Sequence, residues 1–167
     1  MKITDRFMGD HKTFRKLISD INQIAGKPEG LWDQKKLVRW IGLFKTHLLV
    51  HYWGEETFFY PAIRKRLPAN GPLVNRLYLD RLDVEHRTVD HYLDQLEKQL
   101  NHSPLTPEWL QTYQSFTLGL TSHMKKEETE LFPFSEGLLG PSGLEDISNE
   151  IEQHRREAPA VGRHSSL

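Results

Sequence analysis

The 167-residue chain contains no cysteine, which excludes disulfides, thiolate metal ligands, iron–sulfur clusters and a cysteine nucleophile. Any metal site must therefore use histidine, aspartate, glutamate or tyrosine. Neither sign of charge is in excess, because 22 lysines and arginines oppose 23 aspartates and glutamates. We therefore expect neither nucleic acid nor an anionic membrane as a partner. Glycine-rich phosphate loops, dinucleotide fingerprints and nucleophile triads are also absent.

Long apolar runs are missing as well. No stretch approaches the ~20 apolar residues of a membrane span. The first residues, MKITDRFMGDHKTF, lack the apolar core of a secretory signal. We predict a cytoplasmic protein.

Glycine and proline gather at residues 26–30, 67–72, 102–107 and 137–143, and they divide the chain into four long segments. Apolar residues recur in each segment at alternating spacings of three and four, the period of an amphipathic helix. Short connections favour antiparallel neighbours. The sequence predicts a single all-α domain over 1–167. It is an antiparallel up-down-up-down four-helix bundle over about 5–135, followed by an extension over 136–167 with a short helix within 144–156 and a frayed tail.

The apolar residues of each segment form a stripe along one helix face, and each stripe is interrupted by polar residues at one place. The second stripe is expected to continue through Phe58 and Ala62, and the fourth through Glu130 or Leu131. The interruptions fall at six positions, namely His11, His51, Glu55, His86, His123 and Glu127.

These interruptions belong to an internal repeat. HYWGEETFFYP, residues 51–61, returns 72 positions later as HMKKEETELFP, and Asp10-His11 returns 75 positions later as Glu85-His86. Each half of the chain is then one helical hairpin with a lone histidine and a His-x-x-x-Glu pair. Because residues four apart share a helix face, we expect the six groups to converge at one level of the bundle.

Two glutamates buried in an apolar core cost several kcal/mol each unless they are paired or bind metal. No lysine or arginine lies on the stripes, so two cations are the natural compensation. Two histidines per ion and two bridging glutamates are the expected ligands, and this nitrogen and oxygen set suits iron, manganese, zinc or nickel. The Glu-x-x-His pairs of ferritin-like bundles and the His-Glu-x-x-His motif of zincins are both absent.

The six residues, with both His-x-x-x-Glu-Glu motifs running on to a proline, resemble the hemerythrin-like HHE cation-binding family over about residues 5–135. The resemblance implies a four-helix bundle around a non-haem di-iron centre. One iron would take His11 and His51 and the other His86 and His123, with both glutamates bridging. Oxygen-carrying hemerythrins have a further histidine one turn after the third-helix ligand. Here that place is Asp90, which argues against simple reversible oxygen carriage.

Several residues near the six candidate ligands allow two interpretations. Asp90 either ligates weakly or through water, or faces solvent, which we favour. His47 either pairs with His51 on a metal or borders the site, and we favour the border. Glu56 and Glu128 are expected to be exposed helix charges, with contact to a ligand histidine as the alternative. His102, His154 and His164 are expected to be solvated, Tyr52 and Tyr60 to be packing residues, and Pro61 and Pro133 to kink or end their helices.

The resemblance and the residues together predict a di-iron protein that binds oxygen, nitric oxide or peroxide for sensing, scavenging or detoxification. Iron storage, delivery or repair of iron centres is one alternative. A structural zinc or manganese site is another. The sequence identifies no catalytic side chain and leaves the oligomeric state open.

Overall fold

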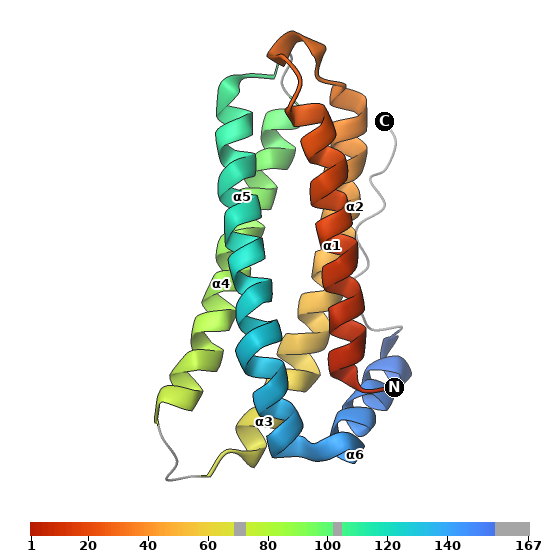
Figure 1. The fold of residues 1–167 in the computed structure, drawn as a ribbon, viewed down its shortest axis with the longest axis vertical. Helices are drawn as coiled ribbons and strands as arrows, with labels where there is room; N and C mark the ends of the chain where they lie inside the picture. The colour runs from red at the N-terminus through yellow and green to blue at the C-terminus, as the bar shows by residue number, and fades with distance from the viewer. Residues whose placement is uncertain (69–72, 102–104, 156–167) are drawn as a thin grey trace.

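The computed structural model describes residues 1–68, 73–101 and 105–155, and every regular element in this part of the chain is helical (Figure 1). The α-helices are α1 (Ile3–Ala25), α2 (Gln34–Gly54), α3 (Tyr60–Arg66), α4 (Leu73–Leu100), α5 (Pro107–Lys126) and α6 (Phe132–Gln153). A 3₁₀ turn, η1 (Glu29–Leu31), precedes α2. Within the described ranges, no helix combines the length and apolarity needed to cross a membrane.

Four long helices form the bundle. α1 packs on α2, α2 on α4, α4 on α5 and α5 on α1, and successive helices are joined at alternate ends (Figure 1). The amphipathic stripes explain this order, because each helix buries one apolar face toward the shared core. The predicted all-α, up-down-up-down bundle is confirmed.

Two π-helical turns interrupt the second and fourth long helices. η2 (Glu55–Phe59) joins α2 to α3, and η3 (Glu127–Leu131) joins α5 to α6. A π turn contains more residues than an α turn, because its hydrogen bonds join residues five apart, and so it displaces the residues after it around the helix. The predicted stripe was wrong at Phe58 and Ala62 for this reason. Both are only half-buried, whereas Phe59 and Ile63 are fully buried.

The same displacement occurs in the second half of the chain, where Leu131 is buried and Glu130 is exposed. Pro61 and Pro133 lie in the first turn of α3 and α6, where a missing N–H is tolerated. Helical structure therefore continues past both prolines, so of the two expected effects they do not end the helices.

The core consists of two apolar clusters. One contains Phe14, Phe44 and Trp109 and lies toward the α1–α2 and α4–α5 connections. The other contains Ile3 and Phe59 and lies toward α3 and α6. Between them lie the six predicted polar residues, which make up six of the eight buried polar or charged side chains of the described chain.

The C-terminal helix closes the second cluster. α6 changes direction at Gly140, whose φ of 67° is unfavourable for a residue with a side chain but not for glycine. After this kink, Leu144, Ile147 and Ile151 are buried against the start of α1 (Figure 1). The expected C-terminal helix is therefore present and ends at Gln153. The predicted frayed tail, 156–167, lies outside the described residues.

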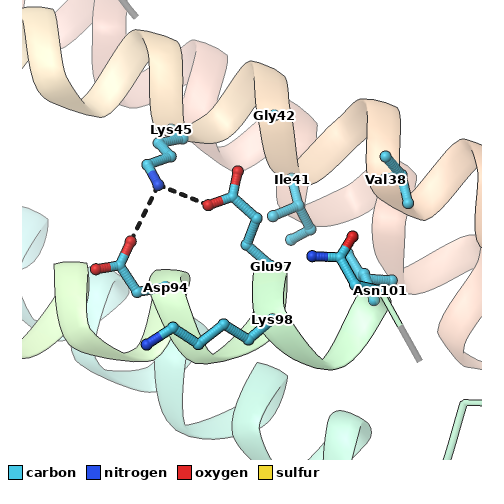
Figure 2. Close-up of a pocket in the computed structure, with 9 residues that line it drawn as sticks. Val38, Ile41, Gly42, Lys45, Asp94, Glu97, Lys98 and Asn101 are labelled. Atoms are coloured by element: carbon cyan, nitrogen blue, oxygen red, sulfur yellow. Dashed lines mark hydrogen bonds and ion pairs between the residues drawn. The ribbon is translucent and has the colours of Figure 1, made fainter. Parts of the chain in front are cut away.

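A surface groove of about 570 Å³ runs between α2 and α4. Lys45 Nζ lies 3.0 Å from Asp94 Oδ1 and 2.6 Å from Glu97 Oε2 across it (Figure 2). These two carboxylates raise the pKa of Lys45 despite its partial burial. None of the six buried polar residues is among the described residues that line the groove, so the candidate site lies elsewhere.

Candidate metal centre

The six polar side chains converge in the middle of the bundle. Their ligand atoms form two groups, within each of which all atoms lie within 4.8 Å of one another. Glu55 and Glu127 belong to both groups; one group adds His11 and His51, and the other adds His86 and His123. None of the six side chains is more than 3% exposed. The convergence expected from the internal repeat is therefore present.

The two histidines of each group face one another through Nε2. His11 Nε2 lies 3.3 Å from His51 Nε2, and His86 Nε2 lies 2.9 Å from His123 Nε2. Two imidazole nitrogens that bind one transition-metal ion at about 2.0–2.1 Å and roughly at right angles are about 3 Å apart. Each histidine pair therefore has the span of two ligands on one ion.

The other ring nitrogen of each histidine, Nδ1, lies beside a carboxylate. The four pairs are His11 with Glu128 at 2.8 Å, His51 with Asp10 at 3.1 Å, His86 with Glu56 at 2.7 Å and His123 with Glu85 at 3.2 Å. An ionised carboxylate only accepts hydrogen bonds, so each Nδ1 carries the proton and donates it. In the neutral ring, Nε2 is then a bare lone pair that points into the centre.

These assignments leave the centre rich in acceptors. Both oxygens of Glu55 and Oε2 of Glu127 accept no hydrogen bond from the described residues. Glu55 Oε1 lies 3.3 Å from His51 Nε2, and Glu55 Oε2 lies 3.3 Å from His86 Nε2. Lone pairs and carboxylate oxygens thus face one another at short range. Positive charge is required between them.

Interactions among these side chains shift their pKa values in a way that reflects this need for positive charge. Burial and the adjacent Glu127 raise the pKa of Glu55 well above its usual range. Burial also opposes a charge on His123, but Glu127 and Glu85 raise the pKa of its imidazole to about 9. Burial lowers the pKa of His51 to about 4, so this ring is neutral and ready to ligate. In the metal-free protein, bound protons therefore take the place of the cations.

Glu56 and Glu128 are not simply exposed helix charges, because each accepts from a histidine of the centre. Glu128 is also held by Arg15, whose Nη2 lies 2.7 and 2.8 Å from its two oxygens. In the other half, Lys126 donates to Glu85, the partner of His123. The sequence contained a sign of this arrangement, since an acid precedes each lone histidine and follows each central glutamate in both halves.

Tyr60 reaches the centre as well, and its assignment as a packing residue alone was wrong. Its hydroxyl donates to Glu127 Oε1 at 2.7 Å and lies 3.4 Å from His86 Nε2. Burial, together with Glu127 and Glu55, raises the pKa of Tyr60 well above its usual range, so the phenol is neutral. Tyr52 packs as expected, with its ring stacked on His86 at a centroid distance of 3.8 Å.

The remaining candidates lie outside the two groups. His47 is exposed and lines a groove on the outer side of His51, in agreement with a border position. Asp90 is half-buried rather than solvent-facing, and burial with the charge of Asp94 raises its pKa to about 6. His154 is half-buried at the end of α6, with its ring 5.6 Å from that of Phe58, so its side chain is partly solvated. His102 and His164 lie outside the described residues.

The sequence was compared with protein families, curated proteins and solved structures. The profile of the hemerythrin HHE cation binding domain matches residues 2–135, and a second, overlapping match covers 77–163. The second match starts within α4, the first helix of the second repeat unit, in keeping with the internal repeat. No curated protein and no solved structure matches significantly. Because the longer family match covers most of a chain whose buried histidines and glutamates are arranged to hold cations, the protein belongs to the hemerythrin HHE cation-binding domain family.

Proposed function

We propose that the buried centre holds two iron ions. His11 and His51 would bind one ion, His86 and His123 the other, and Glu55 and Glu127 would be shared. This proposal rests on acceptor atoms that face one another with no donor between them. The paired Nε2 atoms carry no proton and lie 2.9 and 3.3 Å apart, beside glutamate oxygens that accept no hydrogen bond from the described residues. Histidine and carboxylate ligands suit iron, while manganese or zinc would also fit the donor set.

We further propose that the centre binds oxygen, nitric oxide or peroxide for sensing, scavenging or detoxification. When bound, a di-iron centre supplies reversible binding or redox chemistry for such molecules. Two histidines and two shared glutamates give four side-chain atoms per ion, fewer than the six positions of an octahedral ion, so space for a further ligand remains. Exposure of 3% or less at all six residues restricts that ligand to a small molecule.

The role of the protein chain in this proposal is to orient the ligands and exclude water. The four carboxylates at Nδ1 fix each imidazole tautomer and ring direction, which also makes the ring a stronger ligand. The two apolar clusters on either side keep the centre in a low-dielectric environment. Such burial favours a resident centre over iron delivery, because an ion in transit needs a path to solvent.

A structural metal site is the second candidate, since side chains from α1, α2, α4 and α5 meet at the centre. Ions there would tie the four helices together. Zinc or manganese would serve such a role without any accessible ligand position.

Titration of the iron-loaded protein with azide and nitric oxide separates the two candidates. We expect both probes to change the visible absorption spectrum. The double variant His86→Ala/His123→Ala, which lacks both nitrogens of one position, serves as the control and should lose most of that change. A spectrum indifferent to both probes, together with a lower melting temperature after chelation, would refute the ligand-binding function and support the structural one.

A further inference from the structure

The internal repeat differs between its two halves at a residue beside the centre. An offset of 72 relates His51 to His123, Glu55 to Glu127 and Tyr60 to Phe132. The last pair differs by a single hydroxyl group. The chain thus places a phenol in one half and a phenyl ring at the same position in the other.

The rings of this pair occupy matching places. The Tyr60 ring lies 5.8 Å from that of His86 at an interplanar angle of 20°, and the Phe132 ring lies 5.7 Å from that of His11 at 24°. Tyr60 is fully buried and Phe132 is 4% exposed. Since the two rings are placed alike, the hydroxyl group is what distinguishes the two halves of the repeat at this position.

The aromatic neighbours of the two histidine pairs also differ, with phenylalanines near one pair and tyrosines near the other. Phe7 and Phe14 meet the His51 ring at centroid distances of 5.1 and 5.2 Å, so with Phe132 they give this side phenylalanine neighbours. His86 is instead covered by the rings of Tyr52 and Tyr60. The His11/His51 position is therefore bordered by three phenylalanine rings, whereas the Tyr60 hydroxyl lies beside the His86/His123 position.

The Tyr60 hydroxyl is within reach of anything held by His86. It lies 3.4 Å from His86 Nε2 and 2.7 Å from Glu127 Oε1. These separations are similar to those between neighbouring atoms around one metal ion, so the hydroxyl borders the space that an ion and its external ligand would fill. Rotation about its C–O bond can turn the proton from Glu127 toward that ligand.

We propose that the two metal positions are unequal: the external ligand binds at the His86/His123 position, where Tyr60 donates a hydrogen bond to it. At the His11/His51 position, the rings of Phe7, Phe14 and Phe132 lie beside the histidines, and Phe132 has no hydroxyl where Tyr60 has one. This inference rests on the proposed function, because it requires a metal at the centre. Tyr60 keeps its proton throughout, so no covalent or redox step is involved.

Azide binding to the ferric protein tests the inference through affinity, stoichiometry and the azide stretching frequency. The wild type should bind one azide per chain. Tyr60→Phe should weaken azide binding about tenfold, the effect of losing one hydrogen bond to a charged group, and should shift the azide stretch. Phe132→Tyr adds the missing hydroxyl to the other position and should allow a second azide to bind.

The double variant Tyr60→Phe/Phe132→Tyr moves the hydroxyl and should restore an affinity close to that of the wild type. Equal affinity and an unchanged azide stretch in Tyr60→Phe would overturn the inference, as would two equivalent azides on the wild type. Should Tyr60→Phe fail to retain iron, a Phe132→Tyr protein that still binds a single azide overturns it independently. An iron-loaded wild type that binds no azide refutes the proposed function as well, so the two failures are distinguishable.

Discussion

His86 and His123 face each other through their Nε2 atoms at 2.9 Å in the centre of the bundle. Their Nδ1 atoms donate to Glu56 and Glu85, so the two rings cannot both place a proton on Nε2 without becoming charged. A pair of bare nitrogens at this distance needs a proton or a metal cation between them. The same reasoning holds for His11 and His51, and it accounts for the repeated motif in the sequence.

Removing one central charge should affect the metal-stripped and metal-loaded proteins in opposite directions. The raised pKa of Glu55 means that its ionised form costs stability above the unfolded pKa of about 4.5. We expect Glu55→Gln to raise the unfolding free energy of the metal-stripped protein by about 2 kcal/mol at pH 7. The same change should abolish tight binding of two ions. Urea denaturation with and without metal measures both effects.

Glu150→Gln, an exposed position on α6, is the matched control and should leave both proteins within about 0.5 kcal/mol of the wild type. A Glu55→Gln protein that is less stable than the wild type when metal-stripped would contradict the raised pKa of Glu55.

The carboxylates at Nδ1 should tune metal affinity without touching the metal. Asp10 accepts from His51 Nδ1 at 3.1 Å, and the neutral amide of Asp10→Asn holds the ring less firmly. We expect a loss of metal affinity of about 10-fold to 100-fold, measured by competition with a chelator. Asp5→Asn, an exposed position on the same helix, controls for the change of surface charge. Equal affinity in the two variants would assign Asp10 no part in the centre.

The half-buried carboxyl group of Asp90 should make the stability of the protein depend on pH. Burial and Asp94 raise its folded pKa to about 6, above the unfolded value of about 3.9, so the folded state binds its proton more tightly. Its contribution to stability is therefore lost as pH rises from about 4 to 6. We expect Asp90→Asn to stabilise the protein by about 1 kcal/mol at pH 7, a figure reduced for the solvent that screens this half-buried group, and not at all at pH 3.5. Thermal melts at both pH values test this, and equal shifts at both would contradict it.

The bundle and the convergence of the six residues followed from the sequence because both depend on periodicity. Residues such as His51 and Glu55, four apart on a face that is otherwise apolar, can only point inward. Repetition of the motif then placed the second half of the site by analogy with the first. These are local rules, and the fold obeys them up to the π turns.

The features that the sequence did not predict depend on neighbours from other helices. The π turn at Glu55 displaces Phe59 and Ile63 into the core, and no local propensity indicates it. Glu128 looks like an exposed charge on its own helix, yet it lies against His11 of α1. Tyr60 has an apolar body suited to packing, and only the meeting of its helix with Glu127 shows where its hydroxyl lies.

The number of metal ions bound per chain shows whether two cations occupy the buried centre. The protein would be loaded with ferrous iron without oxygen, freed of excess metal on a desalting column and analysed for iron and protein. We expect two irons per chain, and none retained by the double variant Glu55→Gln/Glu127→Gln, which would confirm a two-cation centre. A wild type that retains one iron or none would contradict it.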